Sequence, residues 1–315
     1  MIEFPDTYAD ITVPAGAVVR SGGTDLQERL RSHNAQPHIV DLTGIEGFAG
    51  ISRSDGRVRI GGGTTMAVVA RELAESHPAL AISTGSLATP QVRATGTFAG
   101  NLTQHTRCWY YRHPEIDCSA TGGDSCPART GRHLYGIVFE RSECVHPHPS
   151  TIAMALLCHD VTVEMADGST RTFAEVLGDG TDPTRTHQLA DGEVIAAIDV
   201  ADGWTGERGA YFRSISRFEA EWPLVEAVVR GRFDGERLAE CALAIGGVAT
   251  VPLRMSAAEE ILTGATLDDA TIRAAAEVCI EGASPLPETG YKVDLVVATV
   301  IETLERLRAT AATAT

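Results

Sequence analysis

Short apolar runs alternate with glycine-rich turns and amphipathic segments over the first hundred residues. The run at 13–20 ends in a two-glycine turn, and the four-residue spacing of Leu26 and Leu30 then indicates a helix. Residues 38–43 predict a second strand, and residues 57–76 predict a strand, a triple-glycine turn and an amphipathic helix. This alternation predicts helices combined with mixed sheets rather than an all-β fold or a helical bundle.

The second half of the chain shows strand patterns and then helical ones. A short helix is expected from about Ser150, followed by strands at 161–165 and 193–200 and by further strands between 208 and 248. Helical periodicity follows at 255–264, 268–282 and 291–308. The pattern therefore predicts a first domain at 1–203, a second at 204–308 and a frayed tail at 309–315.

Charge and hydropathy narrow the range of partners. The chain has 26 basic and 42 acidic side chains, a formal net charge of −16, which argues against nucleic acid and anionic membrane surfaces as partners. It has no apolar run long enough to span a bilayer, and its first residues are acidic where a secretory signal is basic and then apolar. We expect no membrane association and a cytoplasmic location, with export only alongside a partner that carries a signal.

The cysteines are unevenly distributed. Four of the seven fall within 37 residues, separated by nine, seven and seventeen residues: Cys108, Cys118, Cys126 and Cys144. Four thiolates suit an iron–sulfur cluster or a structural zinc ion, although zinc sites usually contain a tighter cysteine pair than any here. A cluster, zinc and unligated thiols all stay open on spacing alone. The other three, Cys158, Cys241 and Cys279, lie in apolar surroundings and are expected to be buried small side chains.

Two glycine-bearing segments resemble ligand-binding turns. Residues 18–26 read as strand, turn and helix start, and the Gly96–Asn101 run GTFAGN follows about 75 residues later. Either is by itself explained by an ordinary turn or a sheet bulge, but a dinucleotide cofactor has a pyrophosphate that must be held from more than one side. Three basic residues in packed segments are either surface ion-pair partners or contacts to a cofactor edge: Arg213, Arg217 and Lys292. Neither a Walker loop nor a nucleophile elbow appears, so a hydrolase or phosphotransferase is not favoured.

Five motifs in a fixed order carry a family resemblance. They are SGGTDL at 21–26, TPQVRATGTFAGNL at 89–102, HPHPSTIAMAL at 146–156, GGVATVPLR at 246–254 and SPLPETGYKVDL at 284–295. In this order they resemble the FAD-binding medium subunit of molybdenum hydroxylases, the xanthine dehydrogenase and carbon monoxide dehydrogenase group. The resemblance implies an α+β fold with a two-lobed FAD-binding domain of the vanillyl-alcohol-oxidase (PCMH) type. A smaller C-terminal α+β domain of the CO dehydrogenase flavoprotein type would follow.

The resemblance also assigns site residues. The pyrophosphate loop would comprise Val18, Val19, Arg20, Ser21, Gly22, Gly23, Thr24, Asp25 and Leu26. The second flavin segment would include Thr97, Gly100 and Asn101. Leu87 and Ile195 would flank the isoalloxazine ring, and Arg213 would lie at its edge. Four positions differ from the family pattern: Ala99 for glycine, Thr151 for a carboxylate, Arg213 for lysine and Thr289 for asparagine.

The insertion at 105–146 resembles that of the flavoprotein subunits of bacterial aldehyde oxidoreductases. This implies a [4Fe–4S] cluster ligated by Cys108, Cys118, Cys126 and Cys144.

The implied function is electron transfer within a molybdenum hydroxylase that oxidises an aldehyde or N-heterocycle. A molybdopterin-binding large subunit and a [2Fe–2S] small subunit would pass electrons to FAD on this chain, and FAD to a soluble acceptor. The sequence nominates no catalytic residue of its own. Two alternatives remain: a stand-alone flavin-dependent oxidoreductase acting on a small molecule, and a zinc-stabilised binding protein without flavin.

Overall fold

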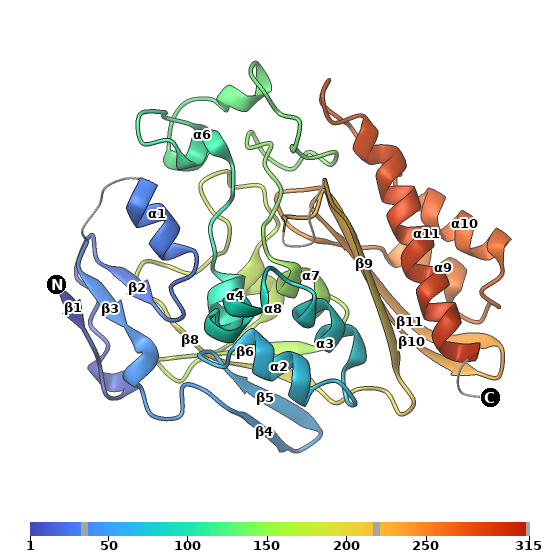
Figure 1. Ribbon diagram of the computed structural model, residues 1–315, viewed down its shortest axis with the longest axis horizontal. Helices are drawn as coiled ribbons and strands as arrows, with labels where there is room; N and C mark the ends of the chain where they lie inside the picture. The colour runs from blue at the N-terminus through green and yellow to red at the C-terminus, as the bar shows by residue number, and fades with distance from the viewer. Residues whose placement is uncertain (33–36, 217–220, 313–315) are drawn as a thin grey trace.

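The first lobe is a small parallel sheet next to one helix. The computed structural model describes residues 1–32, 37–216 and 221–312. Strands β1 (Ile2–Glu3), β3 (Ile39–Asp41) and β2 (Val18–Arg20) lie in that order, and β3 pairs in parallel with both neighbours. Helix α1 (Leu26–Ser32) follows β2 after the two-glycine turn. Figure 1 shows this lobe in blue at the left of the molecule.

The second lobe is a five-stranded antiparallel sheet with helices on one side. Its order is β4 (Ile51–Ser54), β5 (Arg57–Gly61), β8 (Ile195–Ala201), β6 (Val161–Met165) and β7 (Thr170–Thr172). Its helices are α2 (Met66–Glu72), α3 (Pro78–Gly85), α4 (Pro90–Thr95), α5 (Phe98–Leu102), α7 (Thr151–Leu156) and α8 (Phe173–Leu177). Two short 3-10 turns lie between strands: Tyr8–Asp10 between β1 and β2 of the first lobe, and Leu42–Gly44 between β3 and β4, where the chain passes to the second lobe.

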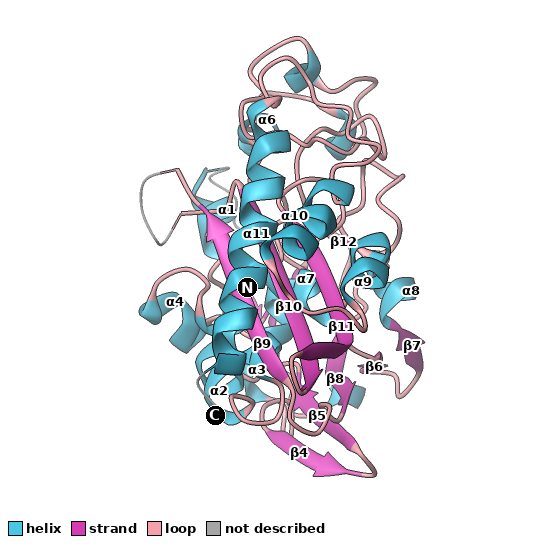
Figure 2. Cartoon of the chain, turned by 90° about the vertical axis from the view of Figure 1, so that its right-hand side faces the viewer, coloured by secondary structure: helices cyan, strands magenta, loops and turns pink. Residues whose placement is uncertain are grey.

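The C-terminal part is a second antiparallel sheet covered by helices on both faces. Strands β12 (Leu253–Arg254), β11 (Arg237–Gly246), β10 (Val225–Asp234) and β9 (Arg208–Ser214) lie in that order. Helices α9 (Ser256–Leu262), α10 (Asp269–Val278) and α11 (Tyr291–Ala312) follow. Helix α11 lies across β9 and β10 (Figure 2), while α3 and α7 of the second lobe pack against this sheet as well. One apolar core therefore runs from the second lobe into the C-terminal sheet.

The cysteine-bearing insertion is mostly irregular and lies at the top of the molecule in Figure 1. It contains the short helix α6 (Trp109–Arg112) and two 3-10 turns, Ser119–Thr121 and Pro127–Arg129. Backbone hydrogen bonds hold its end in place: the N–H groups of Val138 and Phe139 both donate to the carbonyl of Val248, at the end of the C-terminal sheet. The insertion is therefore anchored to the C-terminal sheet.

Two local predictions need correction. The GTFAGN run is the start of helix α5 rather than a loop, because the Thr97 hydroxyl caps the helix by accepting from the N–H of Gly100 at 3.3 Å. Residues 309–312, predicted to be part of a frayed tail, continue helix α11, in which Leu307 is fully buried one turn earlier. Arg217 and residues 313–315 lie outside the described residues.

Within the described part of the chain, no helix combines the length and apolar character needed to cross a membrane.

Candidate functional site

A cavity of about 760 Å³ lies between the parallel lobe and the helices of the second lobe. All fifteen residues predicted to contact a cofactor line it: Val18, Val19, Arg20, Ser21, Gly22, Gly23, Thr24, Asp25, Leu26, Leu87, Thr97, Gly100, Asn101, Ile195 and Arg213. Ala99 and Thr151, two of the positions that depart from the family pattern, line it too. The volume is in the range of roughly 300–1,000 Å³ that holds drug-sized ligands and cofactors.

The turn between β2 and α1 approaches the α4–α5 junction so closely that only glycine fits. A Cβ atom on Gly22 would lie 2.2 Å from the carbonyl oxygen of Thr95, and Gly23 has a φ of +70°. The two glycine-bearing segments therefore meet at one side of the cavity. Next to Gly22, the buried hydroxyl of Ser21 has no hydrogen-bond partner in the described structure, as expected of a side chain that contacts a bound group.

Asn101 faces the cavity with its amide held in one orientation. Its Oδ1 atom accepts a hydrogen bond of 2.7 Å from the hydroxyl of Ser150, the N-cap of α7. The amide –NH₂ group of Asn101 is thus left to donate to a ligand. On the walls, Leu87 and Ile195 are 6% and 3% exposed, so both present buried apolar surface next to the cavity.

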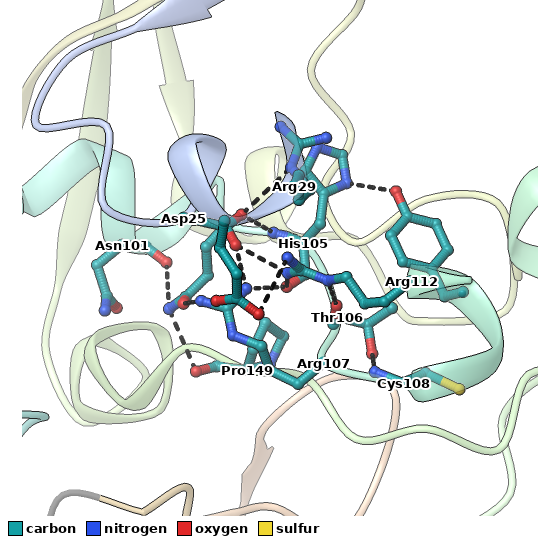
Figure 3. Close-up of polar contacts among 12 residues, drawn as sticks. Asp25, Arg29, Asn101, His105, Thr106, Arg107, Cys108, Arg112 and Pro149 are labelled. Atoms are coloured by element: carbon teal, nitrogen blue, oxygen red, sulfur yellow. Dashed lines mark hydrogen bonds and ion pairs between the residues drawn. The ribbon is translucent and has the colours of Figure 1, made fainter. Parts of the chain in front are cut away.

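The carboxylate of Asp25 links the glycine turn to the cysteine-bearing insertion (Figure 3). It forms ion pairs with Arg107 and, at 2.8 Å, with Arg112, and it accepts from the backbone N–H of His105 at 3.1 Å. Burial alone would raise the pKa of Asp25, but the charge of Arg107 and the hydrogen bonds from Arg112 and His105 hold it below its ordinary value. Asp25 is therefore ionised at neutral pH.

The same network reaches the first clustered cysteine. Arg112 Nε donates to the carbonyl of Thr106 at 2.8 Å, and the Thr106 hydroxyl accepts from the N–H of Cys108 at 3.3 Å. Figure 3 shows this path from Asp25 to Cys108. Because Arg107 lines the large cavity and Cys108 lines a separate small pocket, adjacent residues contribute to the two sites.

The four clustered cysteines line that small pocket together, with Trp109, Tyr110 and Tyr135 around them. Burial raises the pKa of Cys108, despite backbone N–H groups of Tyr111 and Tyr110 that point to its sulfur, and raises that of Cys144 to about 12. Among the described residues, no three His, Cys, Asp or Glu side chains are grouped closely enough to hold a single metal ion. The arrangement therefore gives no support to a mononuclear zinc site.

Cys158 and Cys279 are buried at 3% and 2% exposure, and the partly buried Cys241 packs against the same core. The prediction of buried small side chains is confirmed for Cys158 and Cys279, whereas Cys241 is only partly buried.

Lys292 is the only lysine in the sequence. It is neither of the two things predicted for it, a surface ion-pair partner or a contact to a cofactor edge. It is 1% exposed, does not line the cavity, and donates from Nζ to the carbonyls of Gly247 at 2.9 Å and Tyr135 at 3.3 Å. Desolvation lowers its pKa from 10.5 to about 7. Lys292 thus joins the insertion to the end of the C-terminal sheet.

Several cavity residues had no recognisable signal in the sequence: Gln104, His105, Arg107, His187 and Trp222. Arg107 stacks over the ring of Trp222, 4.4 Å from its centroid, although the two are far apart in the chain. For Arg107, its position next to Cys108 is the only feature of the sequence that suggests a place near a functional site. For Trp222, no local pattern in the sequence predicts a contact with the cavity.

Residues 8–200 match the FAD binding domain in molybdopterin dehydrogenase, and residues 210–307 match the CO dehydrogenase flavoprotein C-terminal domain. The chain belongs to the FAD-binding molybdopterin dehydrogenase family. It is an FAD-binding oxidoreductase subunit of the molybdenum hydroxylase type, and the predicted α+β fold, with its FAD-binding and C-terminal domains, is confirmed.

The sequence similarity to members of this family covers most of the chain. The aldehyde oxidoreductase FAD-binding subunit PaoB of Escherichia coli (strain K12) is 28% identical over 327 residues, covering 97% of this chain and 99% of that protein. The xanthine dehydrogenase FAD-binding subunit of Escherichia coli O157:H7 is 25% identical and covers 85% of this chain and 80% of that one. Reconstituted CO dehydrogenase from Oligotropha carboxidovorans has the same fold, with a TM-score of 0.74 at 20% identity, over 98% of this chain and 97% of that one.

Proposed function

We propose that this chain carries electrons through FAD in a molybdenum hydroxylase that oxidises an aldehyde. The observation that supports this most is the convergence on one cavity of residues 18–26 and 97–101, two segments that are separated by about 70 residues in the sequence. The near full-length similarity to PaoB favours an aldehyde over an N-heterocycle as the substrate class. A molybdopterin-binding subunit and a [2Fe–2S] subunit would supply the electrons, and a soluble acceptor would remove them.

The residues around the cavity suit FAD. Gly22, Gly23 and the unpartnered hydroxyl of Ser21 would hold the pyrophosphate, because this turn exposes backbone N–H groups without a Cβ in the way. Leu87 and Ile195 would flank the isoalloxazine ring, and bound FAD supplies the ability to take electrons singly and release them in pairs.

Asn101 and Arg213 would contact the polar edge of the flavin. The hydrogen bond from Ser150 orients the Asn101 amide so that its N–H donors are available to the ligand. The Arg213 guanidinium supplies a positive charge at the cavity. Donors and positive charge at a flavin's polar edge stabilise the reduced, more negative form. These side chains would therefore raise the flavin potential.

We further propose that Cys108, Cys118, Cys126 and Cys144 ligate a [4Fe–4S] cluster. Their lining of one pocket supports this, as do the backbone N–H groups that point to the sulfurs of Cys108 and Cys144. Hydrogen bonds to cysteine sulfur are among the features that tune such clusters. Since burial raises the pKa of the Cys108 and Cys144 thiols, binding of a cluster to these two residues must release protons.

The test is isolation of the chain with its natural partners. With an affinity tag on this chain in its own host, under exclusion of air, we expect FAD, iron in excess of a [2Fe–2S] subunit's, and molybdenum to co-purify. Aldehyde oxidation should require the whole complex. Isolation of the chain by itself, oxidising a small organic molecule without molybdenum, would contradict the subunit proposal and favour the stand-alone flavoenzyme.

A further inference from the structure

Thr151 occupies a position where the family pattern has a carboxylate, and its hydroxyl is hydrogen-bonded to the carboxylate of Glu226. Glu226, on β10, is 2% exposed, and its Oε2 atom accepts a hydrogen bond of 2.7 Å from the Thr151 hydroxyl. The same oxygen accepts from the Tyr211 hydroxyl at 2.8 Å. Thr151 lines the large cavity, whereas Glu226 and Tyr211 are not among the residues that line it.

The neighbouring strands make room for this buried carboxylate. Gly246 faces Glu226 across the β10–β11 pairing, and a Cβ on Gly246 would lie 2.7 Å from Glu226 Oε1 and 2.9 Å from Cγ. On the other side, Glu226 pairs with Arg213 across β10 and β9. A fully buried carboxylate that needs glycine on one side and faces arginine on the other is a specific arrangement rather than a surface group turned inward.

The hydrogen-bond pattern fixes what Thr151 offers to a ligand. A hydroxyl has one proton to donate and two lone pairs that accept. Because the proton of Thr151 points to Glu226, only lone pairs are left for the cavity. The preceding residue has the opposite effect: Ser150 donates to Asn101 Oδ1 and leaves the Asn101 –NH₂ group for the cavity. Adjacent residues at the start of α7 thus set one acceptor and one donor.

We propose that Glu226 is a positioning residue that makes Thr151 a hydrogen-bond acceptor for a ring N–H of the flavin. In this way a hydroxyl and a carboxylate from another strand together replace the family's direct carboxylate. An isoalloxazine ring carries carbonyl acceptors and an N–H donor side by side at its pyrimidine edge, which matches the donor of Asn101 and the acceptor of Thr151. This inference rests on the proposed function, because it requires that the cavity holds FAD.

The test compares variants that keep or remove the acceptor at each of the two positions. The FAD dissociation constant and the flavin absorption bands are measured on the purified chain after reconstitution with FAD. Thr151→Ser keeps the hydroxyl and should bind within about twofold of wild type, whereas Thr151→Val should bind about fivefold more weakly. Of these two variants at position 151, only Thr151→Val should shift the flavin bands.

Glu226 is tested through the same readout. Glu226→Gln keeps an amide oxygen that accepts from Thr151 and should also stay within about twofold, while Glu226→Met removes the acceptor and should match Thr151→Val. In a Thr151→Val background, Glu226→Met should cause no further loss, because the two residues act as one unit. Far-ultraviolet circular dichroism checks folding, and Thr151→Val with Thr151→Ser and Glu226→Gln still decides the matter if Glu226→Met does not fold.

Three results would overturn the inference: unchanged FAD affinity and spectrum in Thr151→Val, equal losses in Glu226→Gln and Glu226→Met, or fully additive losses in the double variant. The second would show that charge rather than hydrogen-bond direction matters. If the wild-type chain binds no FAD at all, the proposed function fails instead, so the two failures are distinct.

Discussion

Asp25 and Arg112 are 87 residues apart in the sequence, and their side chains form an ion pair of 2.8 Å between Oδ1 and Nη2. Asp25 belongs to the glycine turn at the cavity, and Arg112 to helix α6 of the cysteine-bearing insertion. Both side chains are largely buried, with 14% and 10% of their surface exposed. The turn and the insertion are therefore held in one fixed relationship, so a disturbance of either site should be felt at the other.

The first prediction concerns this ion pair. Asp25→Asn removes the nearest counter-charge of the buried guanidinium groups of Arg107 and Arg112, and we expect the free energy of unfolding to fall by about 3 kcal/mol. FAD and iron contents should fall together, because the side chain contacts both segments. Chemical denaturation and cofactor quantification measure these effects. Glu28→Gln is the matched control: Glu28 is 64% exposed and 3.9 Å from Arg112, so it should cost less than about 1 kcal/mol. Equal effects of the two variants would contradict the prediction.

The second prediction concerns the clustered cysteines. Cys118→Ser replaces a soft thiolate by a poor iron ligand, and we expect iron and its broad visible absorption to be lost while FAD is retained. Cys158→Ser provides the control, since Cys158 is equally buried but lies in the main core, and its iron content should match wild type. Iron analysis of protein prepared without air decides the outcome. Retention of iron in Cys118→Ser would remove this residue from the ligand set.

The third prediction uses the single lysine. Desolvation holds the pKa of Lys292 at about 7, so its amine should be largely neutral at pH 8. Labelling with ¹⁵N-lysine gives one side-chain resonance, whose titration midpoint we expect near pH 7 in the folded chain and near 10.5 after unfolding.

The lowered pKa of Lys292 also makes the free energy of unfolding depend on pH. Between the two midpoints only the unfolded chain binds the proton, so stability rises with pH. From pH 7 to pH 9 the gain should be about 2 kcal/mol larger in wild type than in Lys292→Met. A midpoint above pH 10 in the folded chain would contradict this account.

The fourth prediction concerns acid stability. His148 Nε2 lies 3.1 Å from the carbonyl of Thr186, and Nδ1 accepts from the N–H of Ser150 at 3.2 Å, so the ring is held neutral. Burial lowers the pKa of His148 from 6.5 to about 4, although the contact with the Thr186 carbonyl acts in the opposite direction.

Between pH 6.5 and 4 the unfolded chain therefore binds a proton that the folded chain excludes, and stability falls with falling pH. From pH 7.5 to pH 5 this residue should account for a loss of about 2 kcal/mol. Unfolding curves of His148→Asn should show a lower stability at pH 7.5 but a shallower pH dependence. A pH dependence as steep as that of wild type would assign the acid sensitivity to other groups.

Some features of the site can be predicted from a few neighbouring residues, because they depend on the backbone freedom and side-chain spacing of those residues alone. The two-glycine turn at 21–23 and the start of helix α1 are set by backbone freedom and by the spacing of Leu26 and Leu30. The same holds for two of the three cysteines in apolar segments. The turn or sheet bulge predicted for GTFAGN is wrong, because two glycines in six residues conceal that Thr97 is the N-cap of a helix.

The sequence by itself determined the family, the alternation of strands and helices, and fifteen of the residues that line the cavity. All of these depend on motifs that lie within short stretches of chain. Only the tertiary structure decided which side chains meet: Asp25 with Arg112, Thr151 with Glu226, and Lys292 with the carbonyls of Gly247 and Tyr135. These contacts join segments 45 to 157 residues apart, and their partners are set by how three sheets and an irregular insertion pack, which no local pattern encodes.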